Sequence, residues 1–189
     1  MQWRKCLVLP LLSILGGCSD RVTPVLHEPA EAARLAIETY DANADGVIGG
    51  SEFEESPALA SALERADLDG DGNLSEQELQ SRLEAYQTQS QRIGTIIRLQ
   101  HGRKPLDGAT VTLEMESFLG DGLPVYQGAA DRGGKVTLTR NGESAPMVPV
   151  GLYRVRIKRI GSDQETLRGC EIADDVPGVN SVVFDAKRR

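Results

Sequence analysis

One twelve-residue pattern occurs twice in this chain and constrains its fold more than any other feature. The copies read DANADGVIGGSE, from Asp41 to Glu52, and DLDGDGNLSEQE, from Asp67 to Glu78. Each copy places acidic or amide side chains at positions 1, 3 and 5, glycine at position 6 and glutamate at position 12. Such a segment turns sharply at the glycine and brings the glutamate back toward the first side chains. Two oxygen-rich loops, each between short helices, are therefore predicted.

Oxygen atoms at these positions are the ligands that a calcium ion takes from a protein. The second loop has three aspartates where the first has two, and Gly49 leaves position 9 of the first loop without a side chain, so we expect the second site to be stronger. An acidic turn that binds no metal is the alternative, because Asp, Asn and Gly favour turns in any case. The match at both loops favours Ca²⁺. The predicted ligands, with Val47 and Asn73 acting through their carbonyl oxygens, are Asp41, Asn43, Asp45, Val47, Glu52, Asp67, Asp69, Asp71, Asn73 and Glu78.

The two loops resemble the EF-hand family over about fifty residues. The resemblance implies a helical pair, placed at residues 29–87, in which Pro29 opens the first helix and Ser75 with Glu78 caps the last one. The segment between the loops, residues 53–66, is shorter than in the familiar EF-hand pair and contains Pro57, so its helices are expected to be short. Ile48 and Leu74, both at position 8, are expected to face each other in a short strand pair.

The N-terminus has the features of an export signal. Arg4 and Lys5 precede an apolar run, Cys6 to Leu15, that is too short to span a bilayer. The following tetrad, Leu15 to Cys18, resembles the lipobox of bacterial lipoproteins. This resemblance implies a signal peptide at residues 1–17 and lipidation of Cys18, which would attach the protein to a membrane. An ordinary secretory signal with a chance cysteine is the alternative.

The segment that follows, residues 18–28, has turn-forming residues and no clear period, so it is predicted to be a tether. The resemblance to bacterial lipoproteins implies the outer membrane over the inner one, because Ser19 stands at the second mature position, although Asp20 one place later weakens that inference. The net charge of −7 disfavours both nucleic acid and a bare anionic membrane as partners.

Beyond the polar segment QTQSQ, residues 87–91, the hydrophobic period changes from helical to strand-like. Tyr153, Val155 and Ile157 alternate with charged residues and are expected to face a core. We expect a seven-stranded antiparallel β-sandwich at residues 92–187, which makes the whole chain an α+β multidomain protein. The predicted strands are Ile93–Gln100, Ala109–Met115, Val125–Ala130, Lys135–Arg140, Leu152–Ile160, Glu165–Ile172 and Asn180–Asp185.

Three phrases in this half resemble the carboxypeptidase-regulatory-like, transthyretin-related sandwich. They are GRKPLDGATVTL (102–113), AADRGGKVTLT (129–139) and VPVGLYRVRI (148–157). The resemblance implies a prealbumin-like fold and no particular activity, because a fold does not determine a function. The related hydrolases of hydroxyisourate end in a Tyr-Arg-Gly-Ser signature, whereas this chain ends in FDAKRR.

Catalytic residues are scarce. His27 lies in the predicted tether and His101 in a predicted turn, and neither has a catalytic motif around it. Cys170 is the thiol left once Cys6 departs with the signal and Cys18 takes lipid, and we interpret it as a small core residue.

We therefore expect a non-enzymatic, calcium-binding lipoprotein of the bacterial cell envelope. Its sandwich would bind a protein or cell-wall partner. Two alternatives stay open: a calcium-responsive sensor, whose helical pair opens to bind a partner, and an accessory subunit of a hydrolase.

Overall fold

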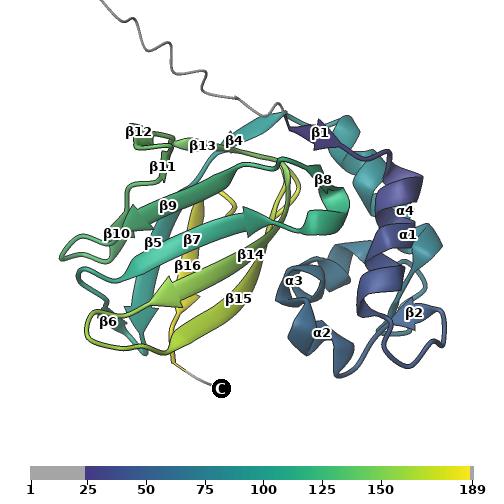
Figure 1. The fold of residues 1–189 in the computed structure, drawn as a ribbon, viewed down its shortest axis with the longest axis horizontal. Coiled ribbons are helices and arrows are strands. Elements are labelled where there is room, and N and C mark those ends of the chain that lie inside the picture. The colour runs from purple at the N-terminus through teal and green to yellow at the C-terminus, as the bar shows by residue number, and fades with distance from the viewer. Residues whose placement is uncertain (1–23, 188–189) are drawn as a thin grey trace, which may run out of the picture.

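The computed structural model describes residues 24–187, which form a helical part, two larger β-sheets and three two-stranded pairs (Figure 1). The predicted signal peptide and Cys18 lie outside the described residues. Within the described part, no helix is both long enough and apolar enough to cross a membrane. The chain is thus a mixed α+β protein in which most strand pairs are antiparallel.

Four helices surround the two predicted loops. They are α1 (Pro29–Tyr40), α2 (Glu52–Glu55), α3 (Pro57–Ala66) and α4 (Glu76–Gln87). Prolines begin α1 and α3, where the missing N–H costs no helical hydrogen bond. The segment between the loops holds the short helices that were expected. Strands β2 (Val47–Ile48) and β3 (Leu74–Ser75) pair antiparallel and place Ile48 opposite Leu74, as predicted.

The larger sheet has six strands in the order β12-β11-β9-β7-β14-β15. Its long central strand β14 pairs with both β7 and β15. Tyr153, Val155 and Ile157 of β14 are all buried, which confirms the predicted inward face. The strands of this sheet are β7 (Thr110–Met115), β9 (Val125–Ala129), β11 (Thr139–Arg140), β12 (Glu143–Ser144), β14 (Gly151–Lys158) and β15 (Glu165–Ile172).

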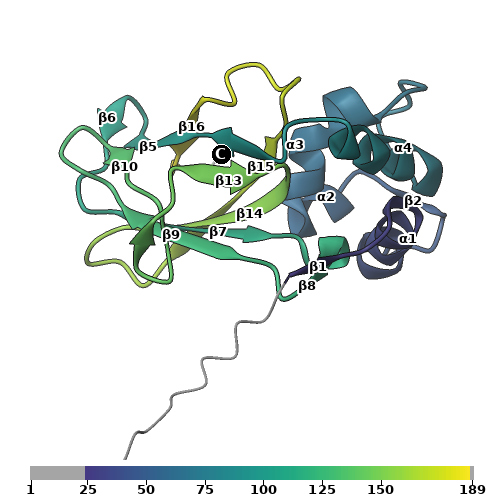
Figure 2. The same cartoon turned by 90° about the horizontal axis from the view of Figure 1, so that it is seen from above.

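The smaller sheet has the order β10-β5-β16, with β6 also paired to β5. Figure 2 shows it as a separate layer above the larger sheet, and apolar residues of both sheets belong to one buried cluster. The strands are β5 (Ile96–His101), β6 (Lys104–Pro105), β10 (Lys135–Val136) and β16 (Ser181–Asp185). Two further pairs join β4 (Arg92–Gly94) to β13 (Met147–Pro149), and β1 (Val25–Leu26) to β8 (Gly120–Asp121), which follows the 3-10 turn Ser117–Leu119.

Each of the seven predicted strand segments contains a strand, but the expectation of a purely antiparallel arrangement was wrong. Strand β16 runs parallel to β5, with Phe184 beside Leu99. Residue alternation shows which side chains are buried and carries no information about the direction of the neighbouring strand. The predicted segments 93–100 and 135–140 are each divided into two strands.

The predicted tether also ends earlier than expected. Val25 pairs with Asp121 and Leu26 with Gly120, so the chain is already held by β8 before α1 begins. His27 continues this attachment: its backbone N–H donates to the Leu119 carbonyl at 3.0 Å, and its ring Nδ1 lies 3.1 Å from the Phe118 carbonyl oxygen.

The helices pack directly on the larger sheet, with α3 against β15 and β14. Gly169 of β15 allows this close approach, because a Cβ atom there would lie 1.6 Å from the carbonyl oxygen of Pro57. The predicted linker is also held by the turn that follows β15: the Ser90 N–H donates to Asp174 Oδ2 at 2.7 Å, and the Asp174 N–H donates to Gln89 Oε1 at 2.8 Å.

Candidate metal centre

The two loops repeat one set of hydrogen bonds. The glycine N–H at position 6 donates to the aspartate at position 1, at 2.9 Å for both Gly46 and Gly72. The position 5 N–H donates to the side chain at position 3, and the position 7 N–H donates to the aspartate at position 5. These bonds hold the side-chain oxygens of positions 1, 3 and 5 on the inner side of each turn, where a cation would bind.

The glutamate at position 12 reaches back across each loop. Glu52 Oε1 accepts from the N–H groups of Ala42 and Asn43, and its Oε2 accepts from Gly49. In the second loop, Glu78 Oε1 accepts from the N–H groups of Leu68 and Asp69. Its Oε2 accepts from the N–H of Ser75 and, at 2.7 Å, from the Ser75 hydroxyl. The predicted capping box is therefore present at the start of α4.

Burial by itself would raise the pKa of Glu78. The hydrogen bonds from Ser75, Leu68 and Asp69 outweigh that effect and hold the pKa of this carboxyl below its usual value. Glu78 is thus kept in the charged form that a cation requires.

Two of the differences between the loops bear on their carboxylates and their backbone. Asp67, Asp69 and Asp71 offer carboxylate oxygens that lie within 4.8 Å of one another. In the first loop Asn43 replaces the middle aspartate, and its Nδ2 donates to Asp45 Oδ2 at 2.9 Å. At position 4 the backbone is left-handed in both loops, and glycine occupies it only in the second, since Ala44 has φ 59° and Gly70 has φ 76°. The second loop is therefore both richer in carboxylates and less strained.

Residues 59–83, which contain the second loop and parts of α3 and α4, match the family model described as EF hand. No curated protein and no solved structure matches the chain. The donor atoms of the matched loop are all oxygen, which suits a hard divalent cation of the size of Ca²⁺. The family match and the aspartate cluster together indicate Ca²⁺ as the cofactor.

The side chain of Asn73, in the second loop, extends over the first loop. Asn73 lies across Gly49, and a Cβ atom on Gly49 would come within 2.0 Å of Asn73 Oδ1. Asn73 consequently lines the hollow over the first loop together with Asn43, Asp45 and Glu52. The buried pair Ile48 and Leu74 joins the loops from the other side.

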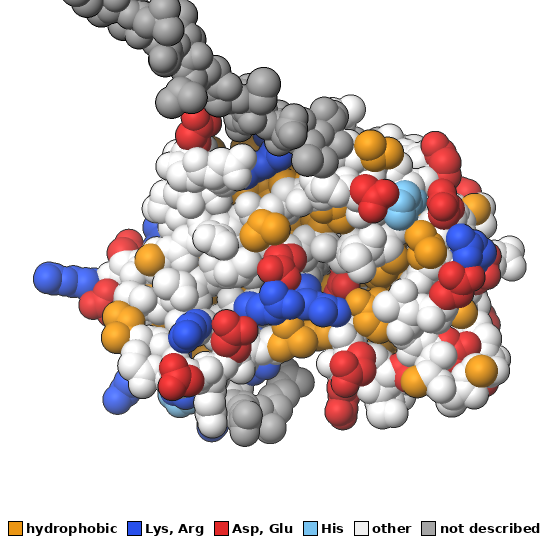
Figure 3. Space-filling view, viewed as in Figure 1, with side chains coloured by type: hydrophobic (Ala, Val, Ile, Leu, Met, Phe, Trp, Pro, Cys, Tyr) orange, Lys and Arg blue, Asp and Glu red, His pale blue; other side chains and the backbone are white. Residues whose placement is uncertain are grey.

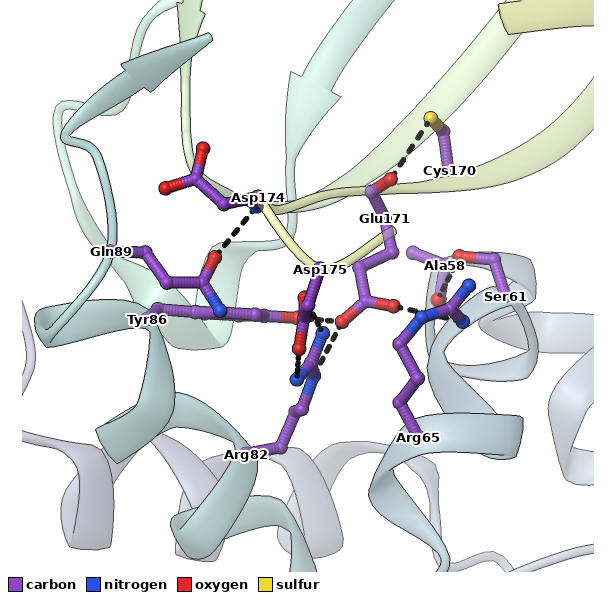
Figure 4. Close-up of polar contacts among 10 residues, drawn as sticks. All are labelled: Ala58, Ser61, Arg65, Arg82, Tyr86, Gln89, Cys170, Glu171, Asp174 and Asp175. Carbon is purple, nitrogen blue, oxygen red and sulfur yellow. Dashed lines mark hydrogen bonds and ion pairs between the residues drawn. The ribbon is translucent and has the colours of Figure 1, made fainter. Parts of the chain in front are cut away.

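Acidic side chains are numerous over the helices and loops in Figure 3, whereas most of the Lys and Arg side chains on that face lie over the sheets. Positive and negative groups meet where α4 contacts the sheet (Figure 4). Arg82 Nε donates to Glu171 Oε1 at 2.6 Å, and its two terminal nitrogens donate to Asp175 at 2.6 and 2.7 Å. The Tyr86 hydroxyl also donates to Glu171 Oε1, and Arg65 Nη1 lies 3.5 Å from Glu171 Oε2.

This cluster is almost removed from solvent, because the side chains of Arg82 and Glu171 are 7% and 1% exposed. Burial alone would lower the pKa of the Arg82 guanidinium, but its hydrogen bonds to Asp175 and Glu171 raise it above its ordinary value. The cluster begins one helical turn after Glu78, so the last ligand of the second loop and Arg82 lie on the same helix face.

A second polar cluster holds the other end of the helical pair. Tyr40, which directly precedes Asp41, donates to Glu116 Oε2 at 2.7 Å and accepts from Arg154 Nη2 at 2.9 Å. Ser56 lies 3.4 Å from Glu116 Oε1. Burial, together with the Glu116 carboxylate, raises the pKa of Tyr40 to about 12.

Sequence reasoning did not find these clusters. Arg82 stands among Leu79, Leu83 and Tyr86 in the sequence of α4, and a charged residue between these apolar positions was the available signal. Glu171 lies within β15 and Glu116 directly follows β7, and both segments otherwise look like ordinary strands in the sequence. Cys170 is buried, as expected, and burial with the nearby Glu171 raises the pKa of its thiol to about 12.

Proposed function

We propose that this protein is a lipid-anchored calcium-binding protein of the bacterial cell envelope whose two sheets form a non-enzymatic interaction module. The observation that carries the calcium part is the aspartate cluster of Asp67, Asp69 and Asp71 within the segment matched by the EF-hand model. The lipobox ending at Cys18 supports the anchor, and the resemblance of residues 92–187 to a carboxypeptidase-regulatory-like sandwich supports the module.

In this proposal calcium acts as a structural clamp. Each loop is close in sequence to one buried polar cluster. Tyr40, just before the first loop, bonds to Glu116, and Arg82, one helical turn after the second loop, bonds to Glu171. Ordering of the loops by calcium would therefore favour the positions of α1 and α4 that make these contacts. With the 10⁻⁴ to 10⁻³ M dissociation constants of extracellular modules, calcium at about 1 mM adds about 0.4 to 1.4 kcal/mol per site.

A calcium sensor is less well supported by the packing of the helices. Sensor pairs open to expose an apolar groove. Here Ala36, Leu59 and Leu79 are already buried, and α3 packs against β14 and β15. A fixed pair fits this arrangement better than one that opens widely.

Isothermal titration of calcium into the chain from Ser19 to Arg189, which contains every described residue, tests the proposal. We expect calcium heat from this chain, and its loss when Glu52→Gln and Glu78→Gln are combined, because both loops then lack their carboxylate at position 12. Glu54→Gln is the matched control, since this exposed glutamate lies just outside the first loop. No heat from the unchanged chain would remove the calcium assignment.

Lipidation needs a separate experiment on the full chain. Expressed in a bacterial host with a fatty-acid analogue, the protein should take up the label and sediment with membranes. Cys18→Ser should abolish both. A labelled Cys18→Ser protein would contradict the lipobox assignment.

A further inference from the structure

A hollow of about 1040 Å³ lies in the sheet part, well away from the calcium loops in the sequence. Its walls come from β9, the β11–β12 hairpin, and the pair β4–β13. The residues that matter for its chemistry are Arg92, Val125, Tyr126, Arg140, Glu143 and Met147.

Tyr126 contributes an unusual group to this hollow. The residue is 1% exposed, and its hydroxyl oxygen has no hydrogen-bond partner within distance and angle limits among the described residues. A buried hydroxyl without a partner costs about 1–3 kcal/mol, so such groups are rare in folded proteins unless something else satisfies them. A ligand that accepts a hydrogen bond would remove this cost.

Two arginines line the same hollow as Tyr126. The pairing of Thr139 with Gln127 places Arg140 opposite Tyr126 in the antiparallel register, and Arg92 reaches the hollow from β4. Burial raises the pKa of Tyr126, and the positive charges of Arg92 and Arg140 act against this rise. Within residues 24–187, neither arginine has a carboxylate at ion-pair distance.

The hollow also has apolar side chains on its wall. Val125 and Met147 line it and are 42% and 46% exposed. Two guanidinium groups and a hydroxyl suit the oxygens of one carboxylate or phosphate, while Val125 and Met147 suit a hydrocarbon chain. Glu143 at the rim opposes an extended polyanion, as does the net charge of −7.

We propose that this hollow binds a single anionic amphiphile, with its oxyanion held by Arg92, Arg140 and the Tyr126 hydroxyl and its hydrocarbon part against Val125 and Met147. A membrane lipid is the source that the topology favours. Strand β1 pairs with β8 through Val25 and Asp121, and the next residue, Gly122, already lines the hollow. The site thus lies at the end of the fold from which the proposed anchor would extend. None of its lining residues belongs to the two loops.

The first test uses dodecyl phosphate, below its micelle concentration, in a titration of the chain from Ser19 to Arg189. We expect it to bind about tenfold or more tightly than a dodecyl glycoside without charge, since hydrogen bonds to charged groups contribute about 1.5–3 kcal/mol. Inorganic phosphate, which lacks the hydrocarbon part, should bind more weakly than dodecyl phosphate. Equal binding of the charged and uncharged amphiphiles would overturn the proposal.

Variants locate the binding. Arg92→Gln with Arg140→Gln should lower the affinity for dodecyl phosphate about tenfold or more. Arg98→Gln with Arg132→Gln is the control, because it removes the same charge from exposed positions outside the hollow. Tyr126→Phe should weaken binding without lowering the free energy of unfolding, since it deletes an unpaired buried hydroxyl. Equal losses in the two double variants would contradict the site.

Vesicles distinguish the two sources of the amphiphile. If the unlipidated chain binds vesicles that contain a phosphatidic acid, and the Arg92 and Arg140 variant does not, the ligand is a membrane lipid. Binding of dodecyl phosphate alone assigns a soluble amphiphile to the same site. Repeating both titrations with a calcium chelator should change neither result, so a failure of the calcium assignment would leave this test intact.

Discussion

Gly169 is the residue at which the helical part comes closest to the sheet. A Cβ atom there would lie 1.6 Å from the Pro57 carbonyl oxygen and 2.3 Å from the Ala58 nitrogen, and both are backbone atoms that cannot move alone. Gly169→Ala should therefore lower the free energy of unfolding by about 1–3 kcal/mol, the usual cost of overpacking. Chemical denaturation measures this change.

Gly94→Ala provides the matched control. Gly94 also lies in a strand, and no atom lies within 4 Å of the position that its Cβ would take. Its substitution should leave stability unchanged within about 0.5 kcal/mol. Equal losses in the free energy of unfolding for Gly169→Ala and Gly94→Ala would contradict the close approach of α3 at Gly169.

Position 4 of the calcium loops allows a paired test at the residue scale. Ala44 and Gly70 share a left-handed backbone, which costs an alanine about 1–2 kcal/mol. Gly70→Ala should therefore destabilise the chain by about 1 kcal/mol and weaken calcium binding. Ala44→Gly should have the opposite effect, reduced by the extra entropy of glycine in the unfolded chain. Calcium titration and denaturation of both variants check the signs, and changes of the same sign would refute the strain argument.

At the scale of elements, Arg82 is the main polar connection between α4 and the sheet. Arg82→Ala would leave Glu171, which is almost fully buried, without its closest positive partner. Removing one member of a buried pair typically costs about 3–5 kcal/mol, because the remaining charge loses its compensation. Arg34→Ala, in the exposed pair with Glu38 on α1, should cost no more than about 0.5 kcal/mol. Similar losses of stability in both variants would argue against a buried cluster.

The same connection predicts a pH dependence. Hydrogen bonds from Arg82 hold the pKa of Asp175 below its usual value. A lowered folded-state pKa stabilises the protein at pH values above the unfolded-state pKa, near 4, and this contribution is lost as the pH falls through the folded-state pKa. As the pH is lowered from about 6 to about 3, the denaturation midpoint should therefore fall less steeply for Asp175→Asn than for the unchanged chain. Parallel curves would exclude this linkage.

These elements also show what sequence patterns can and cannot predict. The Ile48–Leu74 pair, the capping box at Ser75 and the inward face of β14 follow from local spacing, and the structure places them as predicted. The parallel pairing of β16 with β5 and the contacts of Arg82 with Glu171 join residues far apart in the chain. Local periodicity cannot predict contacts between residues that are distant in sequence. Tyr126 likewise looks like an ordinary strand residue in the sequence, and only the structure shows that it lines a hollow with Arg92 and Arg140.

For the whole molecule, the central consequence is that helices and sheets share one buried cluster. Residues of α3 such as Leu59 belong to the same cluster as Val155 of β14 and Ile172 of β15. The calcium loops are therefore attached to a larger cooperative unit, and stabilisation of the loops should stabilise the sheets as well.

Cys170 makes this last prediction measurable, because it lies in β15 and is the only thiol between Ser19 and Arg189. Its burial and a pKa raised to about 12 keep it from reacting with alkylating reagents while the sheet is folded. Calcium at about 1 mM should raise the free energy of unfolding by about 1–3 kcal/mol for two sites together. Loss of helical circular dichroism and exposure of Cys170 should then shift together. If chelation melts the helices while Cys170 stays protected, the helical pair and the sheets are separate folding units, and calcium clamps only the former.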